Sequence, residues 1–140
     1  MREKVRFSLE GRHFRDTHWE VSESSGEGIY SERGAECSLH YRETADGITT
    51  STCLRWEGAT LEVTRSGAVS STLVYELGKR RVSPYTTPFG TFDIVTDTSF
   101  LQINRTPEGI LLELSYKIAY HEEETPRDAT LKVKIKRIPT

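Results

Sequence analysis

Apolar and polar residues alternate along most of this chain, which is the side-chain period of a β-strand. The stretch 5–9 (VRFSL) shows the pattern near the start, and 131–135 (LKVKI) shows it near the end. Similar runs fill the sequence between them, and turn signals such as Asp46-Gly47 and Ser66-Gly67 separate the runs. The pattern predicts about nine or ten strands and no helix.

One apolar face per strand and short connections favour an antiparallel meander, because such a sheet buries a single face. A long meander leaves two exposed edges unless it closes on itself. We therefore predict an all-β fold with one domain over residues 1–140. Its expected form is a single closed antiparallel up-and-down barrel of about 8–10 strands. A two-sheet sandwich is the alternative.

The Asp46-Gly47 turn predicts the register of the hairpin around it. A two-residue turn there places Cys37 opposite Trp56 and His40 opposite Cys53. The two cysteines then point to opposite faces of the sheet and cannot bond to each other. We expect both to be free thiols.

Two segments interrupt the alternation. The segment 22–36 (SESSGEGIYSERGAE) is rich in Ser and Glu and reads either as a mobile loop or as two poor strands. The segment 83–90 (SPYTTPFG) holds two prolines, each of which removes a donor from a strand ladder. We interpret it as a bend or break in the barrel wall, with Tyr85 and Phe89 as candidate plugs of the opening.

The face predicted to point inward carries many aromatic residues and several small hydroxyl residues. The aromatic members are Phe7, Trp19, Tyr41, Trp56, Tyr75, Phe92, Tyr116 and Tyr120, and the hydroxyl members are Thr50, Thr52, Ser71 and Thr96. Such side chains either fill a small barrel or line an apolar pocket that has a few polar groups. Both readings stay open at the level of the sequence.

Arg65 shares the inward parity of Leu61 and Val63, although an unpaired buried charge costs several kcal/mol. One interpretation is that Arg65 closes one end of the barrel, bonded to loop carbonyls and stacked on an aromatic ring. The other is that Arg65 anchors the carboxylate or phosphate of a ligand. The first interpretation is favoured, since structural arginine networks are common.

Composition disfavours several classes of partner and site but does not identify the function. The formal net charge of -2 gives no reason to expect nucleic acid or an anionic membrane as a partner. The first residues carry charges without an apolar segment, and no run approaches the length of a membrane-spanning helix. We expect a cytoplasmic protein. The four histidines show no metal-ligand spacing and no cofactor motif is present, so we predict no metal and no cofactor. Enzyme activity is disfavoured but stays open, because a site assembled from separate strands leaves little local trace in the sequence.

The chain resembles the bacterial YwiB-like family of unknown function, whose members are similar to calycins, over nearly its whole length and most specifically over residues 63–98. The resemblance rests on the stretch 65–69 (RSGAV), on Tyr85, on Phe89-Gly90 and on the strand that ends near Thr96. It implies a closed, lipocalin-like barrel and implies no activity. Calycins often bind small apolar or amphipathic molecules inside the barrel. Ligand binding is inferred for this chain only by analogy with them.

The leading hypothesis is a binding module that holds a small apolar or amphipathic ligand in the interior of the barrel. The candidate ligand-binding residues, at the interior or the opening, are Arg65, Tyr75, Tyr85, Phe89, Thr96 and Tyr116. The alternative is a structural or protein-interaction module with a filled core, a class that includes a homodimer. An enzyme ranks last.

Overall fold

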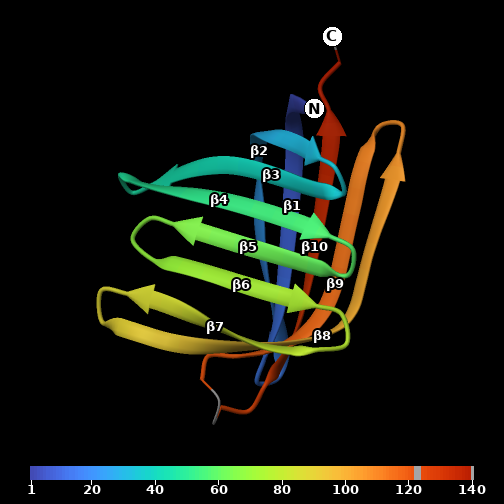
Figure 1. Ribbon diagram of the computed structural model, residues 1–140. Helices are drawn as coiled ribbons and strands as arrows, with labels where there is room; N and C mark the ends of the chain where they lie inside the picture. Colours follow the sequence, from blue (N-terminus) through green and yellow to red (C-terminus); the bar gives the residue numbers. More distant parts are fainter. Residues whose placement is uncertain (122–123, 140) are drawn as a thin grey trace.

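Ten antiparallel strands close into a barrel in the computed structural model, which describes residues 1–121 and 124–139 (Figure 1). The described residues contain no helix, so the predicted all-β class is confirmed. The strands are β1 (Arg2–Arg15), β2 (His18–Arg33), β3 (Glu36–Ala45), β4 (Ile48–Glu57), β5 (Thr60–Ser66), β6 (Ser70–Glu76), β7 (Arg80–Thr87), β8 (Gly90–Thr106), β9 (Gly109–Ala119) and β10 (Arg127–Arg137).

The strand order is that of an up-and-down barrel, as the alternation predicted. Each strand pairs with the next along the chain, and β10 returns to pair with β1. The closing ladder runs from Val5 opposite Arg137 to His13 opposite Ala129. Closure leaves no free sheet edge of the kind that an open meander exposes.

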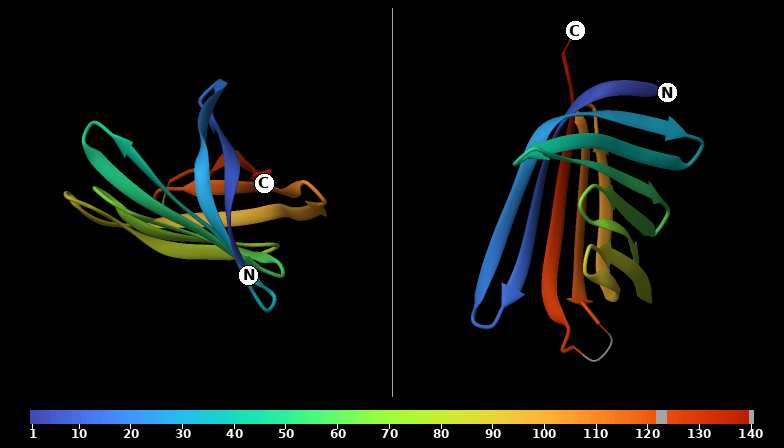
Figure 2. Two further views of the ribbon diagram at one scale, coloured as in Figure 1. Left: turned by 90° about the horizontal axis from the view of Figure 1, so that it is seen from above. Right: turned by 90° about the vertical axis from the view of Figure 1, so that its left-hand side faces the viewer.

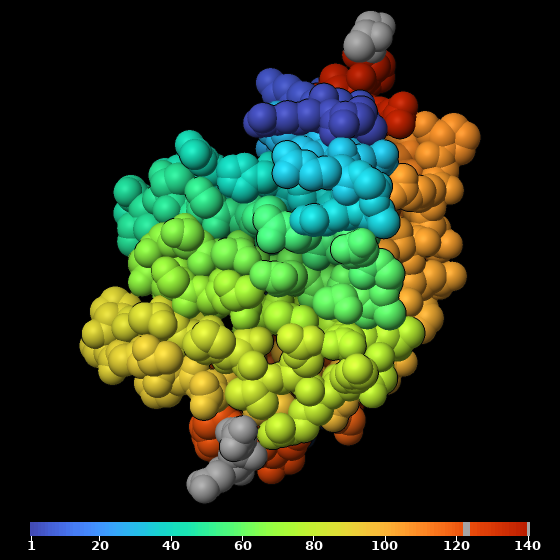
Figure 3. Space-filling view, in the orientation of Figure 1, coloured from blue at the N-terminus to red at the C-terminus, as the bar shows by residue number. Residues whose placement is uncertain are grey.

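The barrel consists of two halves that cross each other. Strands β3 to β6 form one half and run across β1, β9 and β10 in Figure 1, whereas β7 and the start of β8 lie alongside β6 before β8 bends toward β9. The side chains of β3 to β6 form a continuous surface in the space-filling view of the same face (Figure 3). The halves join at two short seams. The β2–β3 seam has five residue pairs, from Ile29–His40 to Arg33–Glu36, and the β6–β7 seam has two. Toward their turns, the β1–β2 and β3–β4 hairpins diverge (Figure 2).

Pro84 explains why the β6–β7 seam is short. The seam pairs Ser70 with Thr86 and Ser71 with Tyr85. The next pair would set Thr72 against Pro84, which has no N–H to donate. The β6–β7 ladder stops there, whereas β7 pairs with β8 without interruption from Arg80 to Thr87. The break predicted for residues 83–90 therefore affects only the β6 side of β7, and residues 88–89 form a hairpin turn.

Side chains replace the missing ladder at this seam. The Thr96 hydroxyl of β8 donates to the Val74 carbonyl at 2.6 Å. The Arg81 guanidinium of β7 donates to the Glu76 carboxylate of β6 at 2.6 Å. Because both contacts connect β6 to the other half, they hold the two halves together where backbone bonds end.

The core lies between the two halves, and aromatic pairs connect them across it. Phe7 of β1 stacks on Tyr41 of β3, with ring centroids 4.1 Å apart. Tyr75 of β6 meets Tyr116 of β9 edge to face at 4.8 Å. Around these rings pack fully buried aliphatic side chains, among them Val5, Leu39, Leu54, Leu61, Ile94, Leu112, Leu114 and Val133. The middle of the barrel is therefore built from packed side chains.

Several predictions from the pattern are confirmed. Cys37 lies opposite Trp56 and His40 lies opposite Cys53, and both cysteines are free.

The segment 22–36 is neither a loop nor two strands, because residues up to Arg33 continue β2 without interruption. Residues 22–27 are exposed or half-buried on both faces of β2, and buried positions begin only at Gly28 and Tyr30.

Three of the aromatic residues expected inside are exposed. The Asp16-Thr17 turn pairs Trp19 with Phe14 of β1, a position that faces outward, and leaves Trp19 48% exposed. Phe92 has the expected parity but lies near the β7–β8 turn, beyond the packed core, and is 48% exposed. Tyr120 follows the last residue of β9 and is exposed as well.

Gly109 allows the close approach of β9 to β10. A Cβ atom built at Gly109 would overlap the carbonyl oxygen of Ile135, which belongs to the backbone and cannot move aside as a side chain can. We expect Gly109→Ala to lower the free energy of unfolding by about 1–3 kcal/mol, the usual range for overpacking. Denaturant unfolding measures this.

Gly26→Ala is the matched control, since its Cβ would meet only the Phe7 ring at 3.5 Å, an ordinary contact distance. Its expected effect stays within about 0.5 kcal/mol. Equal unfolding midpoints for both variants and the parent would show that β9 and β10 are not held this close.

Candidate functional site

A row of inward-facing polar side chains crosses the wall at one end of the barrel, the end of the β3–β4, β5–β6 and β7–β8 turns at the left of Figure 1. We call it the mouth row. It consists of Tyr41, Thr52, Arg65, Ser71 and Tyr85, which are successive register partners on β3 to β7. Because partners in a ladder point to the same face, the regular strand pairing is enough to bring these five side chains together.

Burial varies along the mouth row. Tyr41, Thr52 and Ser71 are buried, whereas Tyr85 is half-buried and packs against the core. Arg65 is exposed. Its position at the end of β5 lets the stem follow the inward parity while the guanidinium reaches water, as long cationic side chains commonly do.

Arg65 faces tyrosine hydroxyls. Burial raises the pKa of Tyr41, and the Arg65 charge and the polar groups of Thr52 and Arg65 oppose that rise. Burial likewise raises the pKa of Tyr75 and of Tyr116, and Arg65 again opposes the rise. These tyrosines are therefore protonated at neutral pH and able to donate hydrogen bonds beside a fixed cation.

His13 adds a further titratable group near this end. It lies on the inward face of β1 and is half-buried. Burial is the largest cause that lowers the pKa of His13, and the Arg15 charge is the next. Glu20 acts in the opposite direction, while Arg127 and Arg65 lower the pKa further. Three arginines from different strands thus act on one histidine.

The arginines at this end differ in their partners. Arg15 lies 3.7 Å from the Glu20 carboxylate, and Arg127 lies 3.2 Å from that of Glu124. Within residues 1–121 and 124–139, no carboxylate forms an ion pair with Arg65. The nearby Glu43 carboxylate, which raises the pKa of Tyr41, accepts a hydrogen bond from the Ser24 hydroxyl at 2.6 Å and forms no ion pair with Arg65. Arg65 is therefore the best-placed group at the mouth for an anion.

Sequence reasoning missed His13 because it examined the histidines only for metal spacing. The signal was present, since His13 continues the inward parity of Val5, Phe7 and Leu9. The cluster of Arg15, Arg65 and Arg127 could not be found from the sequence, because only barrel closure brings these strands to one end.

The other predicted site residues are divided between the mouth and the wall. Tyr75 and Tyr116 form one buried pair within reach of the Arg65 charge. Thr96 is buried, and its hydroxyl is used by the Val74 carbonyl at the β6–β7 seam. Phe89 is 93% exposed in the β7–β8 turn, so it plugs nothing. The turn residue points to solvent because only the strand positions of this hairpin face the core.

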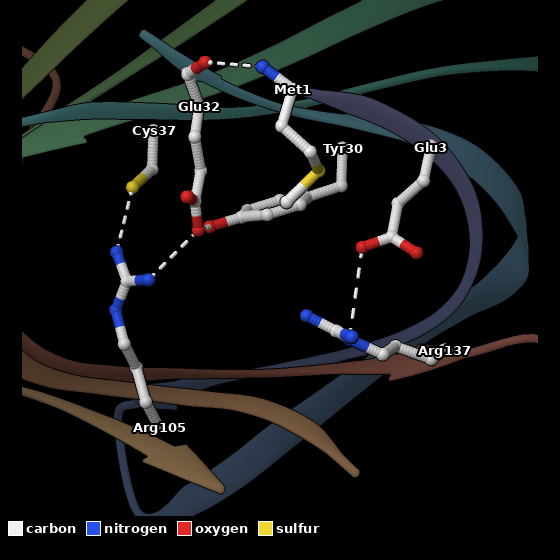
Figure 4. Close-up of polar contacts among 7 residues, drawn as sticks. All are labelled: Met1, Glu3, Tyr30, Glu32, Cys37, Arg105 and Arg137. Carbon is white, nitrogen blue, oxygen red and sulfur yellow. Dashed lines mark hydrogen bonds and ion pairs between the residues drawn. The ribbon is translucent and has the colours of Figure 1, made fainter. Parts of the chain in front are cut away.

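The opposite end of the barrel is capped by a polar cluster around Glu32 (Figure 4). The Tyr30 hydroxyl donates to the Glu32 carboxylate at 2.6 Å, and the Arg105 guanidinium donates to it at 2.8 Å. Arg105 also lies 3.0 Å from the Cys37 sulfur. The role of closing one end, which the sequence suggested for Arg65, is filled here by Arg105.

Charges at the capped end are matched, unlike the charge of Arg65. A groove of about 170 Å³ lies there, lined in part by Glu3, Glu32, Arg105 and Arg137. Arg105 pairs with Glu32 at 2.8 Å, and Arg137 lies 3.7 Å from Glu3. Because each cation has a carboxylate, we interpret this end as structural.

No group of three or more His, Cys, Asp or Glu side chains suited to a metal ion occurs in the part of the chain that the structure describes. The same residues include no helix with the length and apolar character that crossing a bilayer needs.

The Glu32 cluster predicts a component of acid sensitivity. The hydrogen bond from Tyr30 and then that from Arg105 lower the pKa of Glu32 below its ordinary value. A lowered folded-state pKa stabilises the fold above the unfolded-state pKa, and this stabilisation is lost as the pH falls through the folded-state pKa. Glu32→Gln should therefore be less stable than the parent at about pH 7 and should lose less stability between about pH 7 and pH 3.

Urea unfolding at several pH values measures this difference. Glu27→Gln, which removes an exposed carboxylate 3.1 Å from Lys4 on the outer wall, is the control and should follow the parent. Identical pH dependence for Glu32→Gln and the parent would contradict the proposed role of the cluster.

Comparisons with known proteins agree with this architecture. The crystal structure of the ywiB protein from Bacillus subtilis superimposes with a TM-score of 0.87 at 19% sequence identity, over 99% of this chain and 94% of that one. That similarity shows the shared fold and supports the resemblance seen in the sequence. No curated protein sequence gives a significant match. The model of a domain of unknown function, DUF1934, matches residues 7–135, and the chain therefore belongs to this family.

Proposed function

We propose that the protein is a binding module that takes a small amphipathic anion at the mouth row. The observation that carries the proposal is the exposed Arg65 guanidinium, which has no carboxylate partner among the described residues and lies beside buried tyrosine hydroxyls. A carboxylate or phosphate group at this point would accept charge-assisted hydrogen bonds from Arg65 and a further hydrogen bond from a tyrosine.

The apolar part of such a ligand has a surface beside the cation. Tyr85 of the mouth row is the register partner of Phe92 on β8, and the two rings share the inward face of the β7–β8 hairpin. Phe92 is largely exposed although its parity is inward. An acyl or aryl group that covers these rings would remove apolar surface from water.

The mouth suits a ligand better than the deep interior does. Below the mouth row, Leu54, Val63 and Leu73 are buried neighbours on β4 to β6. The Tyr75–Tyr116 pair spans the barrel beside them. A ligand placed deeper would have to displace packed side chains, whereas one at the mouth would only displace water.

Calorimetric titration with decanoate tests the proposal, with decanol as the uncharged comparison. The parent should bind decanoate more tightly than decanol. Arg65→Gln should weaken decanoate binding by roughly tenfold or more, because one charge-assisted bond contributes about 1.5–3 kcal/mol. Since Arg65 is exposed, the urea midpoint of this variant should match that of the parent.

Arg55→Gln is the matched control. Arg55 lies on the outward face of β4, where it pairs with Glu36 at 2.7 Å, so its loss should leave decanoate affinity unchanged. Equal decanoate affinity for the parent and Arg65→Gln would refute the proposed site. A complete lack of binding by the parent would favour the alternative, a structural or protein-interaction module.

A further inference from the structure

Trp19 stands on the outer wall of the barrel, away from the inward-facing mouth row. It is 48% exposed, and its indole packs against Phe14 of β1 with ring centroids 5.3 Å apart. Phe100, on the outward face of β8, is 43% exposed. The contact with Phe14 restricts the orientation of the Trp19 ring. The exposed part of the indole is therefore an ordered aromatic surface that a ligand can contact.

Two depressions of the outer wall adjoin Trp19 and share a hydroxyl-lined floor made by Ser115 of β9 and Thr130 of β10. The first has a volume of about 420 Å³, and its further polar side chains are Asp97, Ser99, Lys117 and Asp128. The second has a volume of about 430 Å³ and is also lined by Glu10, Arg12, Phe100, Glu113 and Lys132.

A β-bulge shapes this part of the wall. The β8–β9 register shifts between Thr98 and Phe100, so that Ser99 is the extra residue. The Ser99 hydroxyl donates to the Ser115 carbonyl at 3.3 Å, across the floor of the first depression. Bulges bend a strand and redirect its side chains, and they are frequent beside functional sites.

The charges around the depressions do not favour an ionic ligand of either sign. In the first, two carboxylates (Asp97 and Asp128) accompany one amine (Lys117). Lys117 and Asp128 are 3.8 Å apart and both largely exposed, so their ion pair is weak and each remains available to a ligand. In the second, two acidic and two basic residues balance each other.

We propose that this outer wall binds a neutral saccharide. The C–H face of a pyranose ring would lie on the Trp19 indole, whose π-face is electron-rich. The sugar hydroxyls would donate to Asp97 and Asp128 and accept from Lys117, while Thr130 can do either. A neutral, polyhydroxylated ligand with one apolar face satisfies an aromatic surface, hydroxyls and mixed charges together. The site does not depend on the mouth row or on Arg65.

Tryptophan fluorescence tests the proposal directly, with cellotriose, maltotriose and N,N′-diacetylchitobiose as the probes. The chain has two tryptophans, and Trp56 is only 3% exposed, so solvent-sensitive emission comes chiefly from Trp19. At least one probe should change this emission with a saturable response. By calorimetry, Trp19→Ala should weaken binding of that probe at least tenfold, and Asp128→Asn should weaken it several-fold.

Phe89→Ala is the matched control, because it removes an exposed aromatic ring far along the β7–β8 hairpin and should leave saccharide binding unchanged. Failure of all three saccharides to bind at millimolar concentration would overturn the proposal. Sedimentation that shows a dimer, together with its loss in Trp19→Ala, would overturn it as well, since a second copy of the chain would then cover this wall.

Discussion

Packing between the two crossed halves of the barrel is the interaction on which the rest of the structure depends. The seams that join the halves provide only five residue pairs at β2–β3 and two at β6–β7. Three buried ring pairs, Phe7–Tyr41, Tyr30–Trp56 and Tyr75–Tyr116, each connect one half with the other. Burial of these rings and of the aliphatic side chains around them therefore has to hold the barrel closed where backbone bonds are few.

The same packing gives the two ends different properties. At the capped end, Glu32, Arg105 and Tyr30 satisfy one another, and the amino terminus of Met1 adds a bond to the Glu32 carbonyl at 3.1 Å. At the mouth, the β1–β2 and β3–β4 hairpins separate. Arg65 there lies beside the Tyr41 hydroxyl and forms no ion pair with a carboxylate of the described residues. Paired charges stabilise the capped end of the barrel. A cation without an ion-pair partner, such as Arg65 at the mouth, is suited to bind an anionic ligand.

The sequence predicted the features that depend on local pattern. Alternation indicated the strands and the closed barrel, Asp46-Gly47 indicated the register of Cys37 and Cys53, and the prolines indicated the break at β7. It failed where a turn reversed the parity, as at Trp19, and where the site joins distant strands, as at His13 and Arg127. Such features depend on how the barrel closes and how its strands tilt. Pairing between distant strands sets both properties, so a short stretch of sequence does not reveal them.

Mapping of decanoate contacts by amide chemical shifts in ¹H–¹⁵N spectra is the most direct test of the account. Saturable shifts should concentrate at the mouth row, on the amides of Tyr41, Arg65 and Tyr85, and the amides of the capped end around Glu32 and Arg105 should not shift. Shifts centred on the capped end, or shifts spread evenly over the outer wall, would contradict it.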